Sequence, residues 1–259
     1  MKYVDVHIHL SNAVYRDRIE AVLRDSEDAR VASIVSSAED YQTSLENLRL
    51  SQRYPTRIYA AVGIHPNNVQ LLGESDLDNT IQLIKQNRLN IVAIGEIGLD
   101  RRAPETEIYA NQISTLNVLL QVAENSGLPV IIHSRGAASE LLEMLPSYRI
   151  SNVMFHWYSG SLDLLPKIVE SGYSLSVGPS ILYAKHLQEI VVNVPLENIL
   201  TETDGPVSYR GPFKGRLTSP SFIPEIVNFI HDLTHKGSEE IAMQIFRNFT
   251  EFFSLDIDS

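Results

Sequence analysis

The amino-acid sequence predicts an α/β fold, a (β/α)8 or TIM barrel that forms one domain over residues 1–259. Short runs rich in Val, Ile and Ala recur about eight times, and stretches with helical periodicity lie between them. No low-complexity linker or shift in composition divides the chain. Strands that alternate with helices form parallel sheets, and about eight such units in roughly 250 residues favour a closed barrel.

The apolar runs are the predicted strands. They cover residues 2–9, 31–38, 58–65, 91–98, 129–134, 152–157, 173–180 and 199–204. An open, doubly wound sheet is the structural alternative. No G-x-G-x-x-G motif follows the first run, so the sequence gives no indication of a dinucleotide-binding sheet of that kind.

Helices are predicted between and after these strands. The clearest cover residues 16–29, 79–87, 109–127, 164–172, 221–233 and 239–253. Two of them end in Gly127 and Gly172, which suits glycine at a helix C-terminus. The last two helices are amphipathic, and we expect them to pack on the outside of the barrel.

Composition and charge limit the functions that the chain can have. The absence of cysteine excludes disulfides and thiolate metal ligands, and it fits a reducing compartment. No apolar stretch approaches the roughly 18 residues of a membrane span, so we expect a cytoplasmic protein without membrane contact. The net charge of −11 argues against a broad basic surface for duplex DNA, although bound divalent cations would reverse the charge locally.

The first predicted strand, YVDVHIHL, carries polar side chains where packing alone would favour apolar ones. Its alternation places Asp5, His7 and His9 on one face. Burial of such groups without partners would cost several kcal/mol. We therefore expect a cation to bind the two histidines.

Similar residues stand at the carboxyl ends of other predicted strands, where TIM barrels carry their catalytic groups. They are His7, His9, His65, Glu96, His133, His156, Glu202 and Asp204. A single strand-end histidine is more often a hydrogen-bonded core residue, but five of the eight histidines gather here. Imidazole and carboxylate ligands suit Zn, Mn, Ni or Fe better than Ca.

These candidate ligands exceed what one tetrahedral ion can use. Two ions that share Glu96 would account for the excess. The first would take His7, His9, Glu96 and Asp204, and the second would take Glu96, His133 and His156.

The motifs match a known family in order. H-x-H, G-I-H-P, G-E-I-G-L-D, I-H-S-R, H-x-x-S-G and E-T-D-x-P, between residues 4 and 206, resemble the TatD-like metal-dependent deoxyribonucleases of the amidohydrolase superfamily. The resemblance implies a distorted TIM barrel with two divalent ions (Mg, Mn or Zn). It also implies phosphodiester hydrolysis, often as a 3′–5′ exonuclease, with DNA as the partner, single-stranded or at 3′ ends.

The resemblance also assigns roles by position. His7, His9, Glu96, His133, His156 and Asp204 match the metal ligands of the family. His65 matches the histidine that reaches the substrate phosphate, and Glu202 matches the carboxylate beside the ligating Asp. Asp204 can accept a proton from a metal-bound water, and His65 and Arg135 can donate to phosphoryl oxygens.

Some residues depart from the family pattern. Trp157 and Tyr158 replace a Cys-Phe pair, and they are expected either to stack a base or to pack at the lip of the barrel. The loop SNAVYRD, 11–17, and Thr218-Ser219-Pro220 are also atypical. Basic residues expected on the catalytic face, with Arg210 among the substrate contacts, are Arg101, Arg102, Arg135, Arg210, Lys214 and Arg216.

Two other functions stay open at this stage. One is a metal-dependent amidohydrolase acting on a small amide, ester or lactone, since the same centre can attack a carbonyl. The other is a metal-bound scaffold without catalysis. His186, His231 and His235 match no motif and are expected on helix surfaces. The sequence does not determine the native metal, DNA against RNA, exonuclease against endonuclease, or the oligomeric state.

Overall fold

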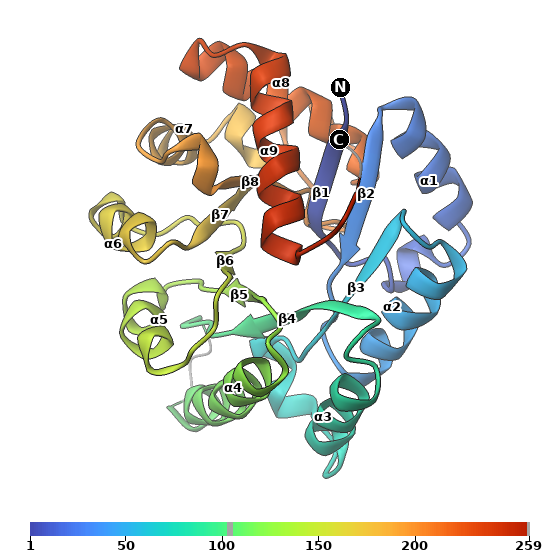
Figure 1. Cartoon of the computed structure of the whole chain (residues 1–259), viewed down its shortest axis with the longest axis vertical. Coiled ribbons are helices and arrows are strands. Elements are labelled where there is room, and N and C mark those ends of the chain that lie inside the picture. The colour runs from blue at the N-terminus through green and yellow to red at the C-terminus, as the bar shows by residue number, and fades with distance from the viewer. Residues whose placement is uncertain (103–105, 258–259) are drawn as a thin grey trace.

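Eight parallel strands form one sheet in the order β1 to β8 (Figure 1). The computed structural model describes residues 1–102 and 106–257; the predicted domain span, 1–259, also includes 103–105 and 258–259, which lie outside the described residues. The strands are β1 Tyr3–Ile8, β2 Val31–Ser36, β3 Ile58–Val62, β4 Ile91–Gly98, β5 Val130–His133, β6 Val153–Phe155, β7 Ser174–Val177 and β8 Ile199–Thr201. This arrangement confirms the predicted (β/α)8 barrel.

Helices follow the strands and surround them. The α-helices are α1 Ile19–Asp28, α2 Tyr41–Arg53, α3 Asp76–Gln86, α4 Thr106–Ser126, α5 Ala138–Met144, α6 Leu165–Glu170, α7 Lys185–Val192, α8 Ile223–Thr234 and α9 Ser238–Phe253. The 3-10 helices are η1 Ala13–Tyr15, η2 Pro66–Leu71, η3 Leu145–Ser147, η4 Leu162–Leu164, η5 Pro179–Leu182, η6 Leu196–Asn198, η7 Gly211–Phe213 and η8 Pro220–Phe222. Gly127 and Gly172 follow α4 and α6 with φ of +62° and +71°, as the sequence predicts.

The seam between β1 and β8 is held by bonds at and beyond the strand ends. The Asp204 N–H donates to His7 O (2.8 Å), and the His9 N–H donates to Gly205 O (2.8 Å). The Asp5 carboxylate accepts the Thr203 N–H (3.1 Å) and the Thr203 hydroxyl. Asp5, which shares the strand pattern of His7 and His9, therefore closes the barrel instead of joining the histidines.

The last helix, α9, lies across the amino-terminal end of the barrel, in front of the strands in Figure 1. Its Asn248 donates to Leu196 O (2.8 Å) and Ile199 O (2.7 Å) at the start of β8. Asn152, just before β6, donates to Phe252 O (2.7 Å), and the ring of Phe249 lies 6.2 Å from that of Tyr59 in β3. The helix expected on the outside of the barrel therefore lies there, and it covers the amino-terminal end.

Several strands are shorter than predicted at the carboxyl end. β3 ends at Val62, β6 at Phe155 and β8 at Thr201, so His65, His156 and Asp204 lie just beyond the sheet. Two of the residues in these segments, Trp157 and Asp204, have φ of +39° and +50°, the left-handed region that non-glycine residues seldom adopt. The backbone leaves the ladder here and turns the polar side chains toward the barrel axis.

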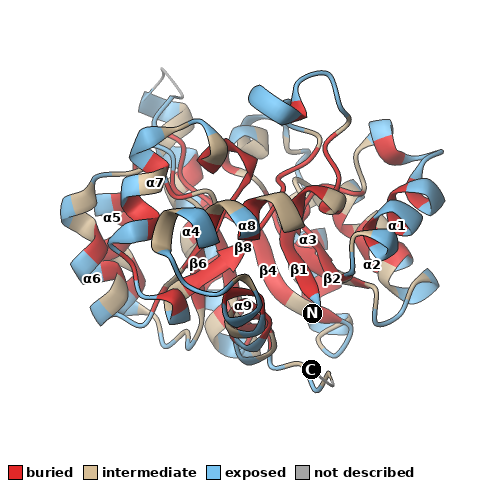
Figure 2. Ribbon diagram, turned by 90° about the horizontal axis from the view of Figure 1, so that it is seen from above, coloured by how far each residue is buried: buried red, intermediate tan, exposed pale blue. Residues whose placement is uncertain are grey.

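Burial follows the barrel plan. The strands are almost fully buried, whereas the surrounding helices expose their outer faces (Figure 2). Throughout residues 1–102 and 106–257, no helix has the length and apolar character needed to cross a membrane.

Candidate metal centre

Glu96 on β4 occupies the middle of the centre, and the glycines on either side of it let β4 approach β5. A Cβ at Gly95 would lie 2.7 Å from Ile131 Cβ, and one at Gly98 would lie 2.0 Å from the carbonyl oxygen of His133. No side chain fits at those separations. The Gly-Glu-x-Gly pattern thus brings Glu96 within reach of His133.

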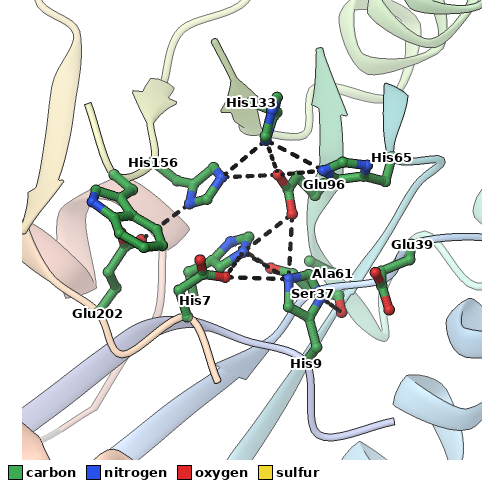
Figure 3. Close-up of polar contacts among 12 residues, drawn as sticks. His7, His9, Ser37, Glu39, Ala61, His65, Glu96, His133, His156 and Glu202 are labelled. Atoms are coloured by element: carbon green, nitrogen blue, oxygen red, sulfur yellow. Dashed lines mark hydrogen bonds and ion pairs between the residues drawn. The ribbon is translucent and has the colours of Figure 1, made fainter. Parts of the chain in front are cut away.

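The two carboxylate oxygens of Glu96 face two different groups of histidines (Figure 3). Oε2 lies 3.2 Å from His7 Nε2 and 3.4 Å from His9 Nε2. Oε1 lies 2.7 Å from His133 Nδ1 and 2.8 Å from His156 Nε2. One carboxylate therefore contacts both groups at once, the geometry of a bridging ligand.

The first group is completed by Asp204. Its Oδ1 lies 3.5 Å from His7 Nε2 and 3.4 Å from His9 Nε2, while those two nitrogens are 3.2 Å apart. Ligand atoms bound at roughly 2.0–2.2 Å by a tetrahedral ion lie about 3.4 Å from one another. The separations among His7, His9 and Asp204 therefore suit one tetrahedral cation, and Glu96 Oε2 lies within reach of both histidines as a fourth donor.

The second group consists of Glu96 Oε1, His133 and His156. His133 Nδ1 and His156 Nε2 lie 3.4 Å apart, again a separation suited to one ion. This group offers two nitrogens and one oxygen, which leaves a position for water or substrate on a four-coordinate ion. The donors predicted from the sequence for both ions are therefore brought together as expected.

The outer ring nitrogens of the histidines show which inner nitrogens are free to ligate. His9 Nδ1 lies 3.0 Å from Ser37 O, and His133 Nε2 lies 3.2 Å from Asp100 Oδ2. Carbonyl and carboxylate oxygens only accept, so each outer nitrogen carries the proton and the inner one keeps its lone pair. His7 Nδ1 lies 3.0 Å from the Ser37 hydroxyl.

His65 has the opposite arrangement. Its Nδ1 accepts the backbone N–H of Asn67 (3.0 Å), so in the neutral ring the proton sits on Nε2. That nitrogen points into the centre, 3.3 Å from Glu96 Oε1. A protonated ring nitrogen cannot bind a cation but can donate a hydrogen bond. His65 is thus built as a donor beside the second group, not as one of its ligands.

The carboxylates of the centre stay ionised although they are buried. Burial raises the pKa of Asp204, but hydrogen bonds from His7 and His9 outweigh it and hold the pKa well below its ordinary value. In the absence of a cation, burial lowers the pKa of His9, but the neighbouring carboxylates of Asp204 and Glu96 raise it by more. The net effect is a pKa of about 9. The buried carboxylates therefore require positive charge, which protons or metal ions can provide.

A cavity of about 890 Å³ opens over the centre. Three of the six basic residues expected on this face line it, namely Arg102, Arg135 and Arg210. Lys214 is not among the lining residues; Arg101 pairs with Glu140 (2.8 Å), and Arg216 pairs with Glu225 (3.2 Å). His186, expected on a helix surface, also lines the cavity, with Nε2 2.8 Å from Gly160 O.

Trp157 and Tyr158 have different environments. Trp157 lines the cavity, and its ring lies 5.6 Å from that of Tyr209. Tyr158 is only 2% exposed, and its hydroxyl donates to Ser161 O (2.7 Å). Tyr158 is not among the cavity's lining residues, so of this pair only Trp157 is placed to touch a ligand.

Glu202 also lies behind the cavity. It is fully buried, accepts a hydrogen bond from Ser176 Oγ (2.6 Å), and holds Oε2 3.4 Å from His156 Nδ1. Glu202 thus lies beside His156, and the catalytic role expected for it stays a prediction.

Sequence reasoning gave no role to Asp100, Ser37 and Asn67. Asp100 orients His133, Ser37 contacts the outer nitrogens of His7 and His9, and Asn67 fixes the proton of His65. Their only signal in the sequence is a place within a few residues of a predicted strand end. That signal is too common to single out a partner.

Comparison with known proteins agrees with this geometry. The profile of the family described as TatD related DNase matches residues 4–254. An uncharacterized metal-dependent hydrolase of Methanocaldococcus jannaschii is 29% identical over 98% of this chain and 97% of its own length. Human deoxyribonuclease TATDN3 is 29% identical over 96% of this chain and 94% of its own. The crystal structure of the TatD homologue YjjV of Escherichia coli covers 98% of both chains, with a TM-score of 0.89 and 27% identity.

Proposed function

Because the chain belongs to the family of TatD-related DNases and is thus a metal-dependent hydrolase, we propose that it cleaves DNA phosphodiesters at a two-metal centre. The observation that carries this proposal is the divided carboxylate of Glu96. One oxygen faces His7 and His9, and the other faces His133 and His156. Two ions that share one carboxylate are typical of enzymes that act on phosphate esters.

The proposed ligands are divided between two positions. The first ion would be held by His7, His9, Glu96 and Asp204, and the second by Glu96, His133 and His156. Such ions supply a water of lowered pKa and neutralise charge on the attacking and leaving oxygens. The nitrogen-rich ligand sets favour Zn²⁺ or Mn²⁺ over Mg²⁺.

Other side chains act directly on the phosphate and the water. His65 donates its Nε2–H to a non-bridging phosphoryl oxygen, since Asn67 keeps the proton on that nitrogen. The carboxylate of Asp204, buried beside the first ion, accepts a proton from the attacking water. Arg135 on the cavity wall adds positive charge beside the same phosphate.

We place a single-stranded 3′ end in the cavity. Its volume of about 890 Å³ is that of a site for one compact ligand, which suits a few nucleotides and excludes a duplex. Arg102 and Arg210 are positioned to contact neighbouring phosphates, and Trp157 is positioned to stack a base. We propose stepwise 3′–5′ removal of nucleotides, the mode that the resemblance to the family implies. The cytoplasmic location expected from the sequence stays a prediction.

Hydrolysis of a labelled oligonucleotide tests the proposal. The protein, loaded in turn with Mg²⁺, Mn²⁺ or Zn²⁺, should shorten a 5′-labelled single strand one nucleotide at a time. Chelator should abolish cleavage, and Glu96→Ala should reduce kcat by at least about a thousandfold, because it removes a ligand of both ions. Circular dichroism would verify that the variant folds.

Two results would contradict the proposal. An intact strand after incubation with protein that carries two bound ions would remove the nuclease activity. Hydrolysis of a small amide, ester or lactone by that same preparation would then assign the centre to carbonyl substrates. Internal cuts instead of a ladder would retain the nuclease and overturn the exonuclease mode.

A further inference from the structure

A second cavity, of about 740 Å³, continues from the catalytic one. It lies between α1 and α2, which stand side by side at the edge of the barrel (Figure 1). The two cavities share Asn12 and Glu39 as lining residues, so the second begins where the first ends. Part of its wall is the atypical loop 11–17, to which the proposed function gives no role.

The second cavity follows one face of α2 along the whole helix. Its lining residues from this segment recur at helical spacing: Glu39, Gln42, Thr43, Glu46, Arg49, Leu50, Arg53 and Tyr54. A helix of this length spans about 20 Å at a rise of about 1.5 Å per residue. The cavity is therefore a groove that leads from the metal centre toward the outside of the barrel. We call it the α1–α2 groove.

Three arginines line this groove beside four carboxylates, those of Asp17, Glu20, Glu39 and Glu46. Arg16 lies on the loop side, and Arg49 and Arg53 lie toward the end of α2. Arg49 pairs with Glu46 (3.2 Å) and Arg53 pairs with Glu20 (2.9 Å), but both arginine side chains are about 70% exposed. Exposed pairs of this kind contribute at most about 1 kcal/mol, so a phosphate can replace the carboxylate partner.

Groups suited to nucleobases lie between the arginines. Leu10, Ile19 and Leu50 give the groove an apolar floor, and Gln42 and Glu39 offer amide and carboxylate groups. Nucleobases have an apolar face and an edge of donors and acceptors that such groups recognise. Ser11 Oγ, in the same wall, is buried and has no hydrogen-bond partner within the described part of the chain.

We propose that the α1–α2 groove binds the part of a single-stranded nucleic acid that extends beyond the reacting phosphate. This inference rests on the proposed function. The strand passes Asn12 and Glu39, then lies along α2 with Arg16, Arg49 and Arg53 near its phosphates. Continuity with the catalytic cavity favours this occupant over a separate protein partner, since anything in the groove lies in line with the substrate.

A series of substrates of increasing length tests the proposal. The double variant Arg49→Gln/Arg53→Gln removes two charges from the groove and leaves the metal centre unchanged. The matched control, Arg24→Gln/Arg247→Gln, removes two exposed charges that line neither cavity. The substrates are bis(p-nitrophenyl) phosphate, a dinucleotide and single strands of about four, eight and twelve nucleotides.

The groove variant should raise KM for the twelve-nucleotide strand about tenfold, with kcat unchanged. Its hydrolysis of bis(p-nitrophenyl) phosphate and of the dinucleotide should match the wild type. Loss of two phosphate contacts should also flatten the slope of log KM against log salt by about 1.4. The control variant should change none of these quantities on any substrate.

Three outcomes would overturn the inference. They are an unchanged KM for the long strand, an equal change in the control, and an equal loss on short and long substrates. Failure of the wild type to cleave any phosphodiester would overturn the proposed function, and this inference with it. If the wild type cleaves the strands and the groove variant has the same KM for them, the inference alone would be overturned.

Discussion

The two ends of the eight-stranded barrel differ in what they bury: charged and polar groups at the carboxyl end, and mainly apolar side chains at the amino end. At the carboxyl end, five histidines gather with Glu96 and Asp204 in a buried cluster. The negative charge of the two carboxylates is not neutralised there unless positive charge is added. At the amino end, α9 presents Phe249 and Asn248, which pack and hydrogen-bond fully within the protein. The residues of the candidate metal centre therefore lie at one end of the barrel, and the contacts of α9 that stabilise the fold lie at the other.

The difference shows how the fold tolerates a site whose buried charges lower its stability. Buried charge is destabilising unless it is paired, and the buried carboxylates of the candidate metal centre need protons or cations beside them. The apolar contacts beneath α9 need no such partner. We therefore expect changes beneath α9 to lower stability and leave catalysis intact, and changes among the residues of the candidate metal centre to do the reverse.

The largest expected effect concerns Phe249. Replacement by Ala should lower the free energy of unfolding by about 3–5 kcal/mol, because the ring is fully buried and a cavity would remain. Urea titration measures the change. Met243→Ala on the same helix, where the side chain is 56% exposed, should have little effect. Loss of bound metal from folded Phe249→Ala protein would show that the two ends are not independent.

An intermediate effect is expected at Asp100. Asp100→Asn should weaken binding of one metal ion about 10- to 100-fold, because His133 loses the carboxylate that keeps its proton on Nε2. Competition with a chelator measures the affinity. Asp25→Asn, an exposed change on α1, serves as the control. A contrary result would be a loss of several kcal/mol of unfolding free energy in metal-free Asp100→Asn protein with unaltered metal affinity. Asp100 would then stabilise the fold and would not orient His133 for metal binding.

The smallest expected effect concerns Tyr158, whose hydroxyl holds a loop at the carboxyl end. Tyr158→Phe should lower stability at neutral pH by about 1 kcal/mol, the usual contribution of one hydrogen bond. Burial raises the pKa of Tyr158 to about 12. Since the folded pKa exceeds the unfolded value of about 10, its stabilising contribution is complete below pH 10 and is lost as the pH rises toward 12.

Stability measured between pH 9 and 12 checks this sign. Wild type should lose more stability over that range than Tyr158→Phe, so the gap between the two proteins should narrow with pH. A gap that stays constant would show that the hydroxyl does not titrate in the expected window. The reverse trend would contradict the assigned direction of the shift.

The sequence predicted the barrel because strand and helix periods alternate without interruption, and it predicted which residues meet in the candidate metal centre because they follow strand ends. That these residues bind metal stays a prediction. It did not predict where α9 packs. An amphipathic pattern shows that one helix face is buried, but it does not show which surface covers that face. The same limit applies to Tyr158 and Glu202, which do not line the catalytic cavity. A position next to a candidate ligand in the sequence does not determine whether a side chain faces the cavity or the core. The proton position on His65 depends on a backbone N–H two residues away, which no side-chain pattern records.

The position of α9 also has a consequence for synthesis of the protein. Its contacts reach the starts of β3, β6 and β8, which are translated long before it. The floor of the barrel therefore stays open until residues 248–253 have left the ribosome. During that interval the nascent chain exposes an apolar surface that the finished protein covers. Folding of the barrel is thus coupled to the synthesis of α9, and a nascent chain without α9 leaves this apolar surface uncovered.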